Sequence, residues 1–481
     1  MGIRVLVIIL YALVIIFFGI MGLKKTRTFS DFFLGGGKVG PWMTAFSYGT
    51  AYFSAVVFIG FAGKVGWGFG YSAVWVGLFN GLVGVFCVWA FMAWRIRKMS
   101  SELGVSTMSE FLEKRYNSRP LKLVASLIIF VFLIPYSGAV FIGLSYLFKT
   151  SFPGIEYWHA VVFMGAFTGL YIVLGGYKSM AVLDMFFGMV MTAGVIILLV
   201  FTIGKAGGMA NLTEGLRAVD PRLTAPVGPP GFRALFSLIF LTSAAPFAMP
   251  QLMQKFFAIK DRKAVKTGIA ASTIFALLIG CIAYFVGSTT RFFINPETAP
   301  EVFLGGRVNV DALMPSLMSM VIPESLFIII LILILSASMS TLAALVLVSS
   351  SSLVKDLYAG FINKEAGDKN LTGLMRIASV FFIILSVIIA LIKPDTIVAI
   401  LGISWGAIGS AFLGPVVWGL FTKFANKYGA WASAVAGLGV TTGMYFSGFS
   451  SPEAGTAGML VSLAVNPAVS LIFRKKSLKN S

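Results

Sequence analysis

Cysteine and histidine are almost absent from this sequence of 481 residues, which contains two cysteines and one histidine. Cys87 and Cys281 both lie in apolar runs, so the sequence indicates neither a disulfide framework nor a zinc site. The histidine, His159, has no partner at a metal-binding spacing, and paired intramembrane aspartates are missing, so no catalytic constellation is visible. We therefore expect a protein that is not an enzyme and that carries no cofactor.

Charged residues are also scarce, at 11% of the chain, and acidic residues are the rarer kind, with 18 Asp and Glu against 37 Lys and Arg. Hydrophobic residues make up 58%, and the mean hydropathy is +0.93. A membrane-spanning helix needs about 20 mostly apolar residues, and such runs recur along the whole chain. The sequence predicts a polytopic protein of the lipid bilayer, and its positive charge reports topology rather than nucleic-acid binding.

Hydropathy and breaker residues divide the chain into 13 predicted transmembrane helices, so the fold class is an all-α membrane protein. Alternate loops hold 27 Lys and Arg on one side and 9 on the other, the first set including Lys255 to Lys266. Because cytoplasmic loops are rich in these residues, we predict an external N-terminus and a cytoplasmic C-terminus. The first span is too long for a signal peptide and should remain as an anchor. The predicted spans are 4–23, 41–67, 70–93, 121–148, 157–176, 180–204, 234–254, 267–290, 313–350, 374–393, 395–421, 428–449 and 456–473.

Two of these spans contain residues that interrupt helices, and five helices separate the two. The second span reads "SYGTAYFSAVVFIGFAGKVGWGFG", and the seventh reads "LTSAAPFAMPQLMQ", with Pro246 and Pro250 four residues apart. Proline leaves backbone carbonyls that hydrocarbon cannot satisfy. Broken helices at matching positions of two halves indicate a transporter with inverted repeats and a central binding site. The alternative is that glycine and proline are simply common in membrane helices.

Hydroxyl groups are conspicuous in the ninth span, in "SASMSTLAALVLVSSSSLVKDLY". Ser340 and Thr341 project about 100° apart on a helix, and Ala337 lies about one turn before Ser340. This arrangement brings a carbonyl and two hydroxyls to one patch, which suits a hard monovalent cation. The alternative is that the hydroxyls bond to carbonyls of their own helix or ease helix packing. We assign Ser338 to packing.

Four separated motifs resemble the sodium:solute symporter family, the group of the proline, pantothenate and monocarboxylate permeases. They are "SDFFLGGGKVGPWMTAFSYGTAYFSAVVFIG", "GGYKSMAVLDMFFGMVM", "FAIKDRKAVKTG" and "SMSTLAALVLVSSSSLVKDLY". The resemblance implies the amino-acid symporter fold, in which spans 2 to 11 form a five-plus-five inverted repeat. The chain 1–481 would then be one transmembrane domain, with an extra helix at 4–23, repeats at 41–204 and 234–421, and two helices at 428–473.

The resemblance also implies a sodium site. In that family the ninth span supplies one carbonyl and two hydroxyls, which correspond here to Ala337, Ser340 and Thr341. The unwound second span supplies two further backbone carbonyls, which correspond to Thr50 and Phe53.

Two charged residues lie within or beside predicted spans. Asp184 is a carboxylate near the cytoplasmic start of the sixth span, where the family carries an acidic residue near the inner exit path; we expect a role in gating or coupling. The alternative is a helix-start charge at the interface. Family members often have glutamine four residues later, where this chain has Gly188. Lys64 could pair with a substrate carboxylate or extend its ammonium to the interface.

The solute is expected between the two broken helices, against aromatic walls with a few polar groups. Tyr52 and Thr242 depart from the residues of the proline symporters, and Tyr52 favours the pantothenate and monocarboxylate branch. The expected partners are therefore sodium and a small organic solute, namely a monocarboxylate, a pantothenate-like anion or an amino acid. The candidate substrate-binding residues are Tyr52, Ser54, Tyr136, Pro250, Gln251 and Trp405.

The predicted function is sodium-coupled import by alternating access, carried out by a monomer in the plasma membrane. Proton-driven carriers commonly relay through several intramembrane carboxylates or histidines, which this sequence lacks, so sodium is the preferred coupling ion. A proton-coupled transporter of the same fold remains the main alternative. An ion channel is a weaker one, because the chain shows no ring of charges or filter.

Overall fold

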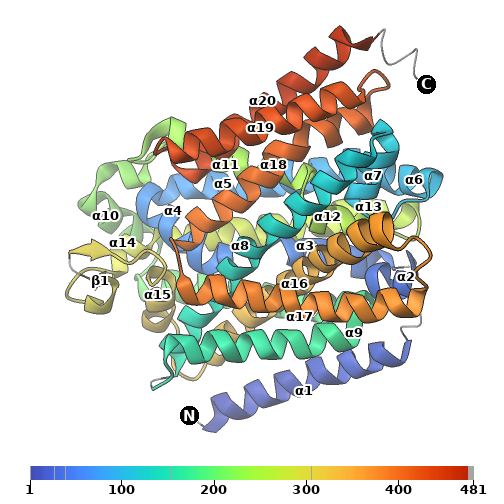
Figure 1. Cartoon of the computed structure of the whole chain (residues 1–481). Coiled ribbons are helices and arrows are strands. Elements are labelled where there is room, and N and C mark those ends of the chain that lie inside the picture. Colours follow the sequence, from blue (N-terminus) through green and yellow to red (C-terminus); the bar gives the residue numbers. More distant parts are fainter. Residues whose placement is uncertain (1, 26–27, 38, 153, 305, 475–481) are drawn as a thin grey trace.

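The computed structural model of the chain describes residues 2–25, 28–37, 39–152, 154–304 and 306–474. Helices make up nearly all of it, and many of them run roughly parallel through one bundle (Figure 1). The α-helices are α1 (Gly2–Lys25), α2 (Phe29–Leu34), α3 (Pro41–Tyr52), α4 (Ala62–Phe69), α5 (Val74–Phe79), α6 (Trp94–Leu103), α7 (Met108–Tyr116), α8 (Arg119–Ser151), α9 (Tyr157–Lys205), α10 (Met209–Val219), α11 (Gly231–Ala244), α12 (Pro250–Phe257), α13 (Arg262–Ser288), α14 (Thr290–Phe293), α15 (Leu313–Val321), α16 (Phe327–Ser351), α17 (Asp368–Ile392), α18 (Ile397–Phe421), α19 (Lys427–Phe446) and α20 (Ser451–Ile472).

Short irregular helices and one small hairpin complete the secondary structure. Strands β1 (Phe303–Leu304) and β2 (Arg307–Val308) pair antiparallel, with Phe303 opposite Val308. Several long helices widen locally into π-helix, a form that frequently marks functional sites. The π segments are Val56–Phe61, Asn80–Cys87, Trp89–Ala93 and Ser352–Ile362, and the 3₁₀ turns are Gly35–Gly37, Gly70–Ala73, Pro221–Thr224, Ala245–Phe247 and Pro300–Val302.

In the described part of the chain, nine helical segments are long and apolar enough to cross a membrane, and Leu6–Gly22 and Tyr157–Val173 are shorter apolar helices. Helices cover all the predicted spans, but the number of membrane crossings stays a prediction. The predicted span 313–350 is wrong at its start, because α15 ends at Val321 and α16 begins only at Phe327. A residue before proline is pushed out of the helical region, and Ile322, before Pro323, has φ −93° and ψ 127°.

The two predicted interruptions are confirmed as breaks in the helices. Helix α3 ends at Tyr52, and Phe53 is extended, with φ −102° and ψ 111°. Helix α11 ends at Ala244, and α12 starts at Pro250 after a 3₁₀ turn. Proline suits the first position of a helix, where its missing N–H has no partner to lose. The break in the second predicted span falls at Phe53, between Gly49 and Gly60, and not at a glycine.

Helix α9 combines two predicted spans, 157–176 and 180–204, around a kink at Gly176. This glycine has φ 61° and ψ −167°, a conformation that L residues rarely adopt. A side chain there would also collide with Phe32, whose ring carbon would lie 2.8 Å from the added Cβ. The kink separates the two halves of α9 and places Asp184 two turns into the second half.

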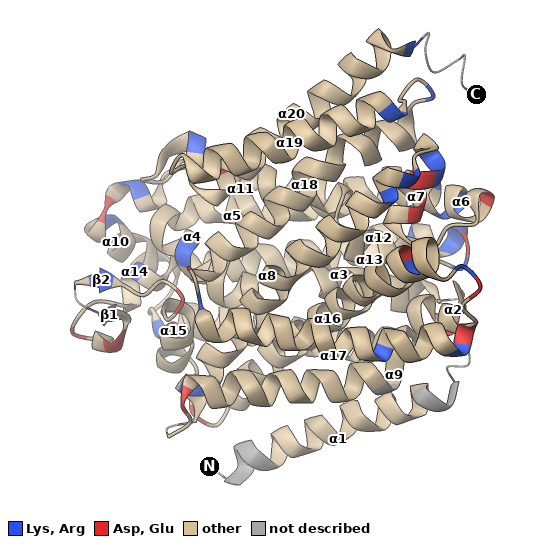
Figure 2. Cartoon of the chain, viewed as in Figure 1, with Lys and Arg blue, Asp and Glu red and all other residues tan. Residues whose placement is uncertain are grey.

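The broken helices lie at the centre of the bundle. Helix α3 packs against α9, α13 and α16, while α1 lies outside against α9 and the pair α19 and α20 covers α18 (Figure 1). Figure 2 shows that Lys, Arg, Asp and Glu gather at the two ends of the bundle and leave a mostly uncharged band between them. This is the distribution that a bilayer requires, since charge at the centre of the hydrocarbon is costly.

Candidate functional site

The end of α3 presents backbone carbonyls to α16. Helix ends leave their last carbonyls without intrahelical donors, and α3 stops at Tyr52, although Phe53 N still donates to Gly49 O. The Thr341 hydroxyl lies 3.3 Å from the carbonyl oxygen of Thr50 and 3.3 Å from that of Ala51. It also lies 3.2 Å from Ala337 O in its own helix. Three carbonyls from two helices therefore converge on one hydroxyl, at the negative end of the α3 dipole.

The Ser340 hydroxyl, beside Thr341, also points to other helices. It lies 2.7 Å from Thr50 Oγ1 and donates to Asp184 Oδ1 at 2.6 Å. Ser338, in contrast, donates to Ile334 O of its own helix at 2.6 Å, so its assignment to packing is confirmed. The structure thus assembles Ala337, Ser340, Thr341 and Thr50 as one oxygen cluster. Phe53 lies fully buried at the break, but the carbonyl next to Thr50 that contacts Thr341 is that of Ala51.

Asp184 is fully buried at the junction of α9, α3 and α16. Ser47 Oγ donates to its Oδ2 at 2.5 Å, and Ser340 Oγ donates to Oδ1. The alternative of a helix-start charge at the interface is therefore wrong, because Asp184 lies within α9, two turns past its kink, and is fully buried in the bundle. Gly188, one turn later, offers no side chain to Asp184, and a Cβ on it would lie 2.3 Å from the Phe46 ring, so a larger residue would require that ring to move.

Lys255 is a residue whose position the sequence did not reveal. We assigned it to a cytoplasmic loop, but it lies on α12 with no exposed surface. Its Nζ is 3.9 Å from Asp184 Oδ2 and 4.9 Å from the centre of the Tyr177 ring. The prediction failed because α12 continues past the apolar run and turns this side chain inward. The 27 to 9 difference between the loop sets is too large for one lysine to reverse.

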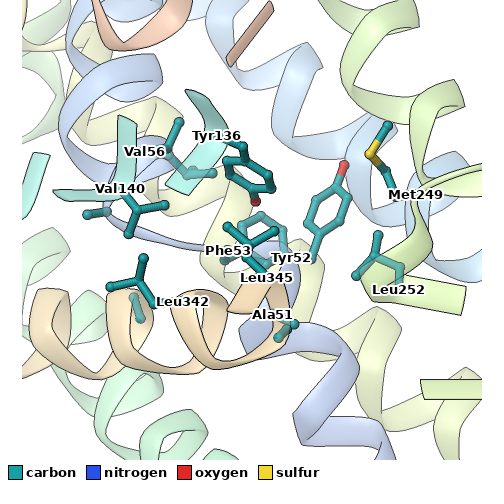
Figure 3. Close-up of a cluster of buried hydrophobic side chains, with 14 of the residues drawn as sticks. Ala51, Tyr52, Phe53, Val56, Tyr136, Val140, Met249, Leu252, Leu342 and Leu345 are labelled. Atoms are coloured by element: carbon teal, nitrogen blue, oxygen red, sulfur yellow. The ribbon is translucent and has the colours of Figure 1, made fainter. Parts of the chain in front are cut away.

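A small cavity lies beside the α3 break. Its volume of about 10 Å³ leaves room for about one water molecule. Tyr52, Ser54, Tyr136 and Trp405, four of the six candidate substrate residues, line it. Trp405 packs edge to face with both Tyr52 and Tyr136, with ring centres 5.8 Å apart in each pair. Figure 3 shows Tyr52, Phe53 and Tyr136 together, above the helix that carries Leu342 and Leu345.

Pro250 and Gln251, the other two candidates, do not line this cavity. Pro250 borders a second small cavity together with Thr107 and Asp356, because α12 leads away from the break. Gln251 is fully buried, and neither its amide nitrogen nor its amide oxygen has a hydrogen-bond partner among the described residues. A buried amide without partners is uncommon in folded proteins.

Polar residues of three further helical segments complete the wall of the cavity, and the sequence analysis did not include them among the candidate substrate residues. Asn80 Oδ1 accepts hydrogen bonds from Thr242 Oγ1 at 2.7 Å and from Ser243 Oγ at 3.0 Å. The Tyr52 hydroxyl donates to Thr242 O at 2.7 Å. Tyr284 also lines the cavity. A lone asparagine in the apolar run "LFNGLVG" was the signal that could have identified Asn80.

The cavity wall contains hydroxyl, amide and indole groups but no charged side chain among the described residues. The Trp405 indole N–H is buried without a hydrogen-bond partner. Such a wall can bind a small solute through hydrogen bonds and aromatic contacts. A charged group on the solute would find only neutral donors here.

Lys64 lies on α4, on the other side of the break from α3 and from the Ser340 and Thr341 hydroxyls that α3 contacts. Its Nζ donates to Thr396 Oγ1 at 3.2 Å, and it borders a pocket of about 480 Å³ together with Asp395. Nearby, Asp311 is buried, accepts a hydrogen bond from Ile397 N at 3.3 Å and lies 3.6 Å from Lys393 Nζ. Burial raises the pKa of Asp311 above its ordinary value, against the lowering effect of Lys393. Lys64 therefore hydrogen-bonds to the residue that precedes α18 and does not line the small cavity.

Sequence comparison matches residues 32–437 to the sodium:solute symporter family. A sodium/pantothenate symporter of Haemophilus influenzae is 29% identical over 427 residues, covering 86% of this chain and 84% of that protein. A high-affinity proline transporter of Bacillus subtilis is 29% identical over 434 residues, covering 87% of each.

Solved structures have the same fold. A sodium-coupled sialic acid symporter in a substrate-bound, outward-open state superposes with a TM-score of 0.81 at 18% identity, over 98% of both chains. A transporter of the nucleobase-cation-symport-1 family, in a closed conformation with bromovinylhydantoin bound, gives a TM-score of 0.57 at 14% identity, over 92% of this chain and 93% of the other. These likenesses establish a helical transporter fold.

Proposed function

Because this chain belongs to the sodium:solute symporter family, we propose that it imports a small organic solute together with sodium. One observation carries the proposal: the Thr341 hydroxyl faces three carbonyl oxygens, of which two belong to the broken end of α3. Unwound backbone and hydroxyls are the oxygen donors from which carriers of this kind build sodium sites. We assign the ion to Ala337 O, Ser340 Oγ, Thr341 Oγ1, Thr50 O and Phe53 O.

The proposed coupling follows from the two helices that share the ion. A cation between α3 and α16 holds them together, whereas its loss leaves the Ser340 to Thr50 hydroxyl contact at 2.7 Å and two longer hydroxyl-to-carbonyl contacts of 3.3 Å. We propose that sodium favours the state that binds solute from outside. Release of sodium on the inner side then lets α3 and α16 separate and the solute leave, as alternating access requires.

We propose that the solute binds where Tyr52, Tyr136 and Trp405 meet. The cavity has no charged wall, and the buried Trp405 side chain places an N–H donor beside Tyr136. A carboxylate accepts hydrogen bonds from such neutral donors and from backbone N–H groups. The preferred solutes are therefore a monocarboxylate, a pantothenate-like anion or an amino acid. Binding of the solute must enlarge the cavity, since a volume of about 10 Å³ holds only one water molecule.

We propose that the protein works as a monomer in the plasma membrane. Its 13 spans place the N-terminus outside and the C-terminus in the cytoplasm, following the excess of Lys and Arg in alternate loops. Asp184 then lies towards the inner side of the sodium cluster, where it acts in coupling.

A screen of small carboxylates, amino acids and sugars by sodium-dependent thermal shift identifies the solute, and uptake into proteoliposomes tests the coupling. We expect saturable uptake that needs an inward sodium gradient. A current without solute dependence contradicts the proposal and favours a channel.

Proton coupling is the second candidate, favoured by the burial of both Asp184 and Lys255, since ionisable groups at membrane depth often relay protons. Uptake driven by a pH gradient without sodium supports it.

A further inference from the structure

Asp184 and Lys255 form a buried ion pair that lies next to the hydroxyl cluster. Neither side chain has exposed surface, and the Nζ to Oδ2 distance of 3.9 Å is long for such a pair. A buried charge without a partner is costly, so each of the two charges depends on the other. The pair joins α9 to α12, the helix that begins where the second break ends.

The Lys255 ammonium is poorly satisfied apart from this carboxylate. Its other contacts among the described residues are the face of the Tyr177 ring at 4.9 Å and the Met180 sulfur at 4.0 Å. An ammonium has three donors, and a ring face and a thioether are weak acceptors. Lys255 is therefore held mainly by the charge of Asp184.

Asp184 connects this ammonium to the candidate ion site through the hydroxyl of Ser340. Ser340 Oγ donates to Asp184 Oδ1 at 2.6 Å, and the same oxygen lies 2.7 Å from Thr50 Oγ1. A cation that binds to the Ser340 oxygen still leaves its hydrogen directed at Asp184. The carboxylate thus attracts a bound cation, while the Lys255 ammonium beyond it repels the cation.

We propose that Lys255 is an internal counter-cation that competes with sodium for the charge of Asp184; this rests on the proposed sodium coupling. Without sodium, the ammonium neutralises Asp184 and keeps the site stable. With sodium, two cations share one carboxylate, and the ammonium is pushed away. Because Lys255 lies on α12, sodium binding displaces this helix and so affects the break between α11 and α12 at Pro250.

Replacement of Lys255 by methionine, K255M, tests this role. Removal of a like charge several Å away, at an effective dielectric of about 20, should strengthen sodium binding on the order of tenfold. We therefore expect a lower half-saturating sodium concentration in thermal-shift titrations of the purified protein, with choline chloride holding the ionic strength constant. K255R keeps the charge and should titrate like the wild type.

A matched control is Lys122 on α8, which is also largely buried and pairs with Glu113 at 3.3 Å. K122M should lower stability without altering the half-saturating sodium concentration. In an Asp184→Asn background, K255M should leave the half-saturating sodium concentration nearly unchanged, because the carboxylate that holds the ammonium and attracts sodium is gone. A gain in sodium affinity as large as that of K255M alone contradicts the competition. K255Q, which keeps a polar side chain at this position, replaces K255M if the unpaired Asp184 lowers the yield of purified K255M.

The possible outcomes separate this inference from the proposed function. If the wild type shows no sodium-specific shift, sodium coupling itself is wrong. If the wild type responds to sodium and Ser340→Ala weakens that response, the site stands. An unchanged half-saturating concentration in K255M, or an equal change in K122M, then overturns the role of Lys255.

Discussion

The hydroxyl of Thr341 offers the sharpest test of the proposed ion site, and T341A is the change that removes it. The hydroxyl contacts three carbonyls at 3.2 to 3.3 Å, two of which belong to the broken end of α3. Neutral hydrogen bonds contribute about 0.5–1.5 kcal/mol net, and those to charged groups contribute about 1.5–3 kcal/mol. Loss of the hydroxyl should therefore cost the sodium-free protein about 1 kcal/mol and weaken sodium binding by about 10- to 100-fold.

Sodium-dependent uptake into proteoliposomes measures this effect at a saturating solute concentration. We expect T341A to raise the sodium concentration for half-maximal uptake, with a smaller loss of thermal stability in the absence of sodium. T341S keeps the hydroxyl and should stay within a few-fold of the wild type.

Ser338 provides the matched control, because its hydroxyl bonds to Ile334 O within α16 and, among the described residues, to no other helix. S338A should leave the sodium dependence unchanged. The assignment of the site is refuted if T341A takes up solute with the sodium dependence of the wild type, or if S338A impairs it equally.

Three further predictions concern residues outside the ion cluster. Gly188→Gln should lower the melting temperature, because its Cβ would lie 2.3 Å from the Phe46 ring and the ring must move, and a normal melting temperature would contradict this packing. Arg115→Lys should lower the melting temperature, since the guanidinium donates to three carbonyls, one in the last turn of α18 and two in the loop before α19, at 2.7, 2.7 and 3.2 Å. One ammonium cannot reproduce this pattern, and an unchanged melting temperature would count against it. Burial raises the pKa of Asp311 although Lys393 lowers it, so the folded state holds this proton more tightly than the unfolded state and Asp311 contributes less stability as pH rises through its pKa. The melting temperature of the wild type, relative to Asp311→Asn, should therefore be higher at pH 4 than at pH 7, and a pH-independent difference would refute the argument.

The ion pair of Asp184 and Lys255 changes how the site is understood. A cluster of hydroxyls and carbonyls alone is neutral and attracts a cation only through dipoles. With a buried carboxylate one hydrogen bond away and a buried ammonium beyond it, the proposed sodium site should have an affinity that depends on the position of α12. This is the physical route by which we propose that the second broken helix responds to an ion at the first.

Several features of the protein could be predicted from the sequence because they depend on local properties of the chain. Hydropathy identified the helical segments, and proline placed the break before α12, since a missing N–H acts on its own helix. The hydroxyls of Ser340 and Thr341 stood out because an apolar helix surrounds them. The ninth span was placed too early, although Pro323 marked its true start.

Contacts between distant segments were decided only by the tertiary structure. Thr50 and Thr341 are 291 positions apart, and Ser340 and Asp184 are 156 positions apart, so no local pattern joins them. Lys255 follows the apolar run of its span and was assigned to a loop, yet the path of α12 buries it against Asp184. Hydropathy reports how readily a segment enters the membrane, whereas the partner of each buried polar group depends on how the helices pack.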